Sequence, residues 1–191
     1  MIRNLLILFF VSSCANVDLG YINLFNDRLS ANKITNLQPF YNTNFSFIRI
    51  TRGRNQAIFI LGDYKDGMET WYGPQKELIQ TYKGLIISTE KLPFNIKFNN
   101  IDVNKFPFEE MSSGYITLFE PRADYLEFKF LKINVTSSDE CSTHYSFERI
   151  ITTIRNKEIF NICYDSNGRT IYSRQRPHPL DKEILIEYFY Q

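Results

Sequence analysis

The spacing of turn residues from residue 45 onward most constrains what this chain can fold into. Short runs rich in aromatic and β-branched residues alternate with turn signals such as Asp66-Gly67 and Lys83-Gly84, a pattern typical of β-hairpins. Most connections are only a few residues long. Because a parallel crossover needs a dozen or more residues, strands this close together can pair only antiparallel.

The pattern predicts about ten to twelve short strands. Their expected ranges are 45–52, 56–64, 69–72, 77–82, 85–89, 94–98, 115–119, 126–135, 143–153, 158–164, 170–174 and 183–190. Ser30 is a candidate N-cap for a short helix ending at Leu37, before Pro39. We therefore expect an all-β fold, an antiparallel meander bent into a sandwich or incomplete barrel, with a short N-terminal helix.

The longest alternating run changes phase near its middle. Alternate residues from Leu126 to Phe130 share one face, whereas alternate residues from Leu131 to Val135 share the other. A strand keeps its phase only while its pleat is regular, so this slip predicts a bulge or a bend.

Composition agrees with a sheet-rich domain and indicates no charged partner. The 17 phenylalanines and 12 tyrosines favour strands. The net charge is +1, and removal of an N-terminal segment containing Arg3 would leave a neutral chain. A neutral domain gives no electrostatic reason to expect nucleic acid.

The N-terminus has the layout of a secretory signal. Arg3 precedes a short apolar run from Leu5 to Val11, which is too short to span a bilayer. Val11-Ser12-Ser13-Cys14 resembles the lipobox of bacterial lipoproteins, in which the signal is cut before a cysteine that becomes lipidated. The alternative is an apolar N-terminus in which Cys14 is incidental.

The lipobox resemblance divides the chain into three parts. Residues 1–13 form the expected signal peptide, 14–20 a lipidated tether and 21–191 a single β domain. Several acyl chains, palmitate among them, would anchor the domain stably in a bilayer. Ala15 follows the cysteine, and by analogy with lipoprotein sorting this favours the outer membrane, with the domain facing the periplasm.

The other two cysteines, Cys141 and Cys163, are candidates for a disulfide. An exported protein meets an oxidising compartment, and a bridge closing this loop would stabilise the fold by about 3 kcal/mol. The alternative is two unpaired buried thiols. We expect no metal or other cofactor, because His144 and His178 show no ligand spacing with both cysteines.

Separated segments of the chain resemble the YjbF/GfcB family of lipoproteins. Trp71 is followed by a turn, a strand and the segment from Gly84 to Thr89, and the stretch from Tyr164 to Gln175 matches the family more closely. Leu85, Lys91 and 161–163 depart from the family pattern. The matched positions, which are also the candidate binding residues, are Trp71, Gly84, Thr89, Asp165, Gly168, Ser173, Arg174 and Gln175.

The resemblance implies a role without catalysis. Lipoproteins of this family accompany the export of group 4 capsule or related exopolysaccharide, together with an outer-membrane β-barrel protein and a small periplasmic companion. No enzymatic activity is attached to the family. The family fold is an antiparallel meander bent into a sandwich or incomplete barrel.

The residues themselves form no convincing active site. Asp63, Asp66 and Glu69 could mimic the paired carboxylates of a glycosidase, but the sequence favours a solvated hairpin face for them. Trp71 either stacks on a sugar ring or packs in the core. Arg174 either pairs with a carboxylate on a partner or polymer, or holds the fold together.

We therefore expect a non-enzymatic outer-membrane lipoprotein that assists capsule or exopolysaccharide assembly or export by docking to a barrel partner. The alternative is a periplasmic polysaccharide-binding module that contacts the polymer directly. A polymer-trimming enzyme is a third class, and it would require two carboxylates at working distance across a cleft.

Overall fold

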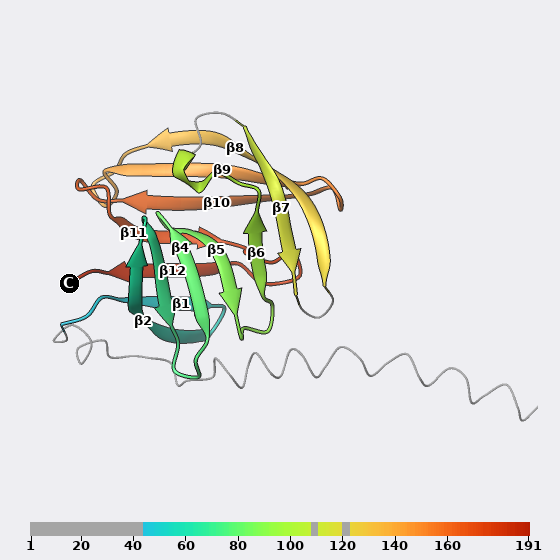
Figure 1. The fold of residues 1–191 in the computed structure, drawn as a ribbon. Helices are drawn as coiled ribbons and strands as arrows, with labels where there is room; N and C mark the ends of the chain where they lie inside the picture. The colour runs from blue at the N-terminus through green and yellow to red at the C-terminus, as the bar shows by residue number, and fades with distance from the viewer. Residues whose placement is uncertain (1–43, 108–110, 120–122) are drawn as a thin grey trace, which may run out of the picture.

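The computed structural model describes residues 44–107, 111–119 and 123–191. Within these ranges twelve strands form one antiparallel barrel (Figure 1). The strands are β1 Phe47–Arg52, β2 Asn55–Lys65, β3 Met68–Tyr72, β4 Leu78–Tyr82, β5 Leu85–Glu90, β6 Ile96–Asn99, β7 Ser112–Leu118, β8 Asp124–Thr136, β9 Thr143–Ile151, β10 Asn156–Tyr164, β11 Thr170–Gln175 and β12 Ile184–Phe189. Each of the predicted ranges overlaps one of these strands.

The barrel is closed, so the predicted sandwich or incomplete barrel is wrong. Every strand pairs with its neighbour in sequence, and β1 also pairs with β12, from Phe47 opposite Phe189 to Thr51 opposite Leu185. Closure removes the unpaired sheet edges that an open meander would leave. The predicted N-terminal helix over 30–37 lies outside the described residues. The helical element of the described ranges is the 3-10 turn η1, Val103–Lys105.

Side chains fill the interior of the barrel. Phenylalanines from β6, β8, β9 and β10 pack ring against ring, with centroids about 5 Å apart, and are Phe98, Phe128, Phe130, Phe147 and Phe160. Twelve strands would otherwise enclose a wide lumen. The opposite walls are close, because a Cβ on Gly84, in the β4–β5 turn, would lie 2.8 Å from Thr170 and 2.9 Å from Ile162. The β4–β5 turn therefore packs directly on β10 and β11.

A buried ion pair joins two neighbouring strands. Arg149 of β9 donates to the carboxylate of Glu158 on β10, with Nε 2.9 Å from Oε2. Its other nitrogens donate to the backbone carbonyls of Arg176 and Pro177, after β11. Burial lowers the pKa of Arg149, and Glu158 opposes that shift. The pair therefore joins β9 and β10 to the β11–β12 connection.

The predicted phase change in the longest strand is confirmed as a bulge. The register of β8 against β9 shifts between Lys132 and Asn134. Before the bulge, Phe130 is completely buried and the next residue, Leu131, is exposed, as regular alternation requires. The extra residue then places Val135 opposite Tyr145, a position that Asn134 would take in a regular strand.

The β5–β6 contact is the least regular part of the barrel. Its only Cα-paired positions among the described residues are Ser88 and Lys97. Thr89 supports it, because its hydroxyl accepts from the backbone N–H of Ile96 at 3.0 Å and lies 3.4 Å from the carbonyl of Phe94. No helix within the described ranges is long and apolar enough to cross a membrane.

Candidate functional site

Gly84 and Gln175, two of the motif residues, meet inside the barrel. The Gln175 amide donates to the carbonyl of Gly84 at 2.8 Å and to the hydroxyl of Ser173 at 3.0 Å. Its oxygen accepts from the backbone N–H of Ile86 at 3.1 Å. From β11, Gln175 therefore hydrogen-bonds backbone groups of the β4–β5 turn and of β5 across the barrel, and its role is structural.

Asp165 and Gly168 form the turn between β10 and β11. The Asp165 carboxylate accepts from the backbone N–H groups of Asn167 at 2.8 Å and Arg169 at 2.9 Å. Gly168 has a φ of +76°, which glycine adopts without steric cost. These residues therefore fix the hairpin.

Arg174 differs from its two neighbours in the Ser173-Arg174-Gln175 motif. Ser173 and Gln175 are buried, whereas Arg174 points outward on β11 and is exposed. Its Nε lies 3.7 Å from a carboxylate oxygen of Glu183, and both side chains are about half exposed. Arg174 is therefore the motif residue that can reach a partner on the outer face.

Trp71 lies in the core and begins a chain of hydrogen bonds to the barrel end. Its indole N–H donates to the hydroxyl of Thr81 at 2.9 Å, and Thr81 donates to Glu69 at 2.8 Å. Tyr190 donates to the other oxygen of Glu69 at 2.7 Å. Because the ring is 0% exposed, Trp71 cannot stack on a polymer outside the barrel.

Glu69 is a buried carboxyl group, 7% exposed. Burial raises its pKa above the ordinary value, and the hydrogen bonds from Tyr190 and Thr81 offset part of that rise. Carboxyl groups with perturbed pKa values that border a hollow are candidates for functional sites.

A hollow of about 380 Å³ opens beside Glu69 at the end of the barrel where the described chain enters and leaves, which we call the mouth. It is lined by Leu61, Tyr64, Gly67, Glu69, Lys83, Gly168, Arg169, Thr170, Tyr190 and Gln191. Tyr64 is directly opposite Glu69 in the β2–β3 pairing, so both side chains stand on the inner side of the sheet. Tyr64 is nevertheless 66% exposed, because it lies at the open rim.

The rim of the mouth carries two cations. Lys83 is exposed, with its Nζ 3.0 Å from the carbonyl of Phe106, and its own carbonyl accepts from Tyr164 at 2.6 Å. Arg169, after the β10–β11 turn, is also exposed. The mouth therefore combines aromatic rings, a buried carboxyl group and two exposed positive charges.

The other candidates for chemistry do not gather at the mouth. Asp63 and Asp66 are exposed on the β2–β3 hairpin, whereas Glu69 is buried. His178 is buried, and its Nδ1 accepts from the backbone N–H of Leu180 at 3.0 Å. Within the described ranges no group of His, Cys, Asp or Glu residues could hold a metal ion.

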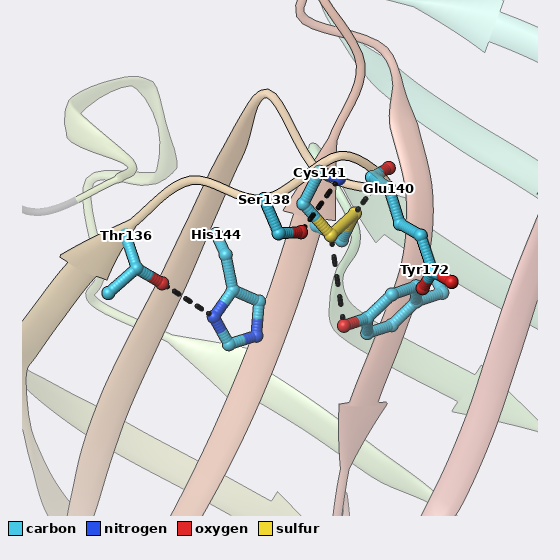
Figure 2. Close-up of a disulfide and its surroundings, with 7 residues drawn as sticks. Thr136, Ser138, Glu140, Cys141, His144 and Tyr172 are labelled. Atoms are coloured by element: carbon cyan, nitrogen blue, oxygen red, sulfur yellow. Dashed lines mark hydrogen bonds between the residues drawn. A yellow bond between two sulfur atoms is a disulfide. The ribbon is translucent and has the colours of Figure 1, made fainter.

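The Cys141–Cys163 disulfide is present, which confirms that prediction. It ties the β8–β9 loop to β10, and Figure 2 shows the hydroxyl of Tyr172 directed at the bridge, 3.8 Å from the sulfur of Cys141. His144, beside it, lies 3.4 Å from the hydroxyl of Thr136. The lipidation site Cys14, the signal 1–13 and the tether 14–20 lie outside the described residues.

The interpretation of the sequence missed most of the mouth. Glu69 was expected on a solvated hairpin face, and Tyr64 and Tyr190 were not singled out. One signal was available, because Glu69 and Trp71 are two apart in one strand and must share a face. A buried Trp71 therefore places Glu69 on the inside.

The strand arrangement is similar to that in the crystal structure of the hypothetical lipoprotein YmcC from Escherichia coli. The match has a TM-score of 0.65 at 12% sequence identity, and it covers 88% of this chain and 92% of that chain. No family model matches the sequence, and no curated protein matches it. The comparison shows a shared fold alone, and membership of the YjbF/GfcB family stays a prediction.

Proposed function

We propose that this chain is a non-enzymatic lipoprotein, anchored to the outer membrane through Cys14, that assists capsule or exopolysaccharide assembly or export. In this proposal acyl chains hold the β barrel on the periplasmic side of the membrane. The barrel then docks to an outer-membrane β-barrel partner and a periplasmic companion.

The observation that carries the proposal is the likeness of the fold to that of a hypothetical lipoprotein over most of both chains. The resemblance of Val11-Ser12-Ser13-Cys14 to a lipobox supports it independently. The two lines of support come from different parts of the chain, since the described strands begin at Phe47.

The placement of the motif residues supports a role through contact. Trp71, Ser173 and Gln175 are buried and hydrogen-bonded within the barrel. Arg174 is exposed on the outer face and offers a planar guanidinium to a carboxylate. The side chains available to a partner are therefore those of the outer face and the mouth.

A pull-down from membranes tests the docking role. The tagged full chain is solubilised in mild detergent and captured, with a Cys14→Ser chain as the control. We expect the native chain to recover an outer-membrane barrel protein, and the Cys14→Ser chain to leave the membrane fraction. Recovery of lipid without a barrel protein would count against docking.

Direct contact with the polymer is the second candidate function, and the mouth is the observation that favours it. The residue first considered for such contact, Trp71, is enclosed in the core. A Trp71→Ala substitution would therefore remove core packing and not a ligand contact. Tyr64, exposed at the rim of the hollow, is the aromatic side chain placed to meet a ligand.

A further inference from the structure

The mouth has the construction of a small ligand site. Its base is Glu69, whose two oxygens are held by Thr81 and Tyr190, so the carboxyl group has a fixed direction. Tyr64 is exposed on the same side of the sheet, at the rim. Hollows at the ends of barrels, with aromatic walls and a few oriented polar groups, are common positions for ligands.

The charges of the lining residues restrict the class of ligand. Lys83 and Arg169 lie at the rim, so they disfavour a cationic ligand. Glu69 lies at the base, and its carboxylate disfavours an anionic one. A neutral molecule avoids both penalties. Hydroxyl groups can donate to the carboxylate and accept from the rim cations, and the apolar face of a sugar ring suits the Tyr64 ring.

From this geometry we infer that the mouth binds a segment of a neutral, hexose-containing polysaccharide, with Tyr64 stacking on a sugar ring and Glu69 accepting from its hydroxyl groups. The inference deepens the proposed function, on which it rests for the class of polymer. The two can fail separately, because saccharide binding is measured on purified protein and docking is measured by recovery of a barrel protein from membranes.

Trp71 provides a built-in reporter for the mouth. It is the only tryptophan in the chain, and it is joined to Glu69 through Thr81. Its ring also lies 6.4 Å from that of Tyr190, which lines the hollow. A ligand that contacts Glu69 or Tyr190 changes the surroundings of Trp71, so its fluorescence emission changes.

The experiment titrates the full chain with defined oligosaccharides while Trp71 emission and the heat of binding are recorded. The chain is kept in a detergent without a sugar headgroup, so that the detergent does not compete. The neutral probes are maltohexaose, cellohexaose and laminarihexaose. Hexagalacturonate and hexalysine test the anionic and cationic classes.

Tyr64→Ala is the test variant, and Tyr125→Ala is the matched control. Both side chains are largely exposed, at 66% and 69%, so both variants are expected to fold. Tyr125 is near the start of β8, at the opposite end of the barrel. We expect a neutral hexaose to change Trp71 emission, and Tyr64→Ala to weaken binding roughly tenfold, as loss of one stacked ring would.

Four results would overturn the inference. The first two concern the ligand: no neutral hexaose binds, or only hexagalacturonate or hexalysine binds. The other two concern the site: a hexaose gives heat of binding without a change in Trp71 emission, or Tyr64→Ala and Tyr125→Ala weaken its binding equally. Binding of a neutral hexaose that Tyr64→Ala weakens and Tyr125→Ala leaves unchanged would support it.

Discussion

Replacement of Gly84 by alanine tests the packing of the β4–β5 turn across the barrel. Gly84 has a φ of +81° and lies against β10 and β11. An alanine Cβ there would lie 2.8 Å from Cγ2 of Thr170 and 2.9 Å from Cγ2 of Ile162. Both neighbours are buried, so neither side chain can move into solvent.

The expected cost has two parts. The left-handed backbone conformation costs alanine about 1–2 kcal/mol, and forcing a methyl group into a packed core costs about 1–3 kcal/mol. Gly84→Ala should therefore lower the free energy of unfolding by about 2–5 kcal/mol. Gly168→Ala is the matched control, because Gly168 has a φ of +76° but no atom within 4 Å of its added Cβ. Gly168→Ala should therefore lower the free energy of unfolding only by the cost of the left-handed backbone conformation, about 1–2 kcal/mol.

Thermal unfolding followed by circular dichroism measures the difference. An extra loss of about 1–3 kcal/mol corresponds to a midpoint about 2–12 °C lower for Gly84→Ala than for Gly168→Ala. Adding Thr170→Ser, which removes the clashing Cγ2, should restore part of the midpoint. Equal midpoints for the two alanine variants would refute the contact between the β4–β5 turn and the far wall.

Three further perturbations have defined outcomes. Arg149→Met leaves the buried Glu158 carboxylate without its ion-pair partner, and should lower the free energy of unfolding in urea by about 3–5 kcal/mol. The double variant Arg149→Met/Glu158→Leu should lower it by less. An equal or larger loss in the double variant would contradict the pairing. Serine at both Cys141 and Cys163 should cost about 3 kcal/mol, whereas unchanged unfolding in reductant would contradict a formed bridge. Burial raises the pKa of Glu69 in the folded state, so the folded barrel binds this proton more tightly than the unfolded chain does. The free energy of unfolding should therefore increase as the pH falls through the raised pKa towards the ordinary value. Glu69→Gln should reduce this increase, and a pH profile of unfolding that is the same in both proteins would contradict the raised pKa.

Local sequence patterns predicted where the strands lie. Turn pairs such as Lys83-Gly84 and the alternation around the β8 bulge act over a few residues, so they can be read from the chain directly. The pairing of β1 with β12 joins the two ends of the domain, and no local pattern specifies it. This is why the barrel was expected to be open and is closed.

The candidate site was predictable only in part, for the same reason. Trp71 and Gln175 were singled out, but their partners are distant in sequence. Gln175 bonds to Gly84 from 91 positions away, and Tyr190 bonds to Glu69 from 121 positions away. Such contacts appear only once the barrel is closed, and they make most of the motif residues parts of the fold.

Lipid anchoring at Cys14 is tested by the mass of the N-terminal peptide from membrane-bound protein. We expect a mature chain that begins at Cys14, with a mass increased by a diacylglycerol on its sulfur and an acyl group on its amino terminus. A membrane-bound chain that retains residues 1–13, or that begins at Cys14 without added lipid, would contradict it.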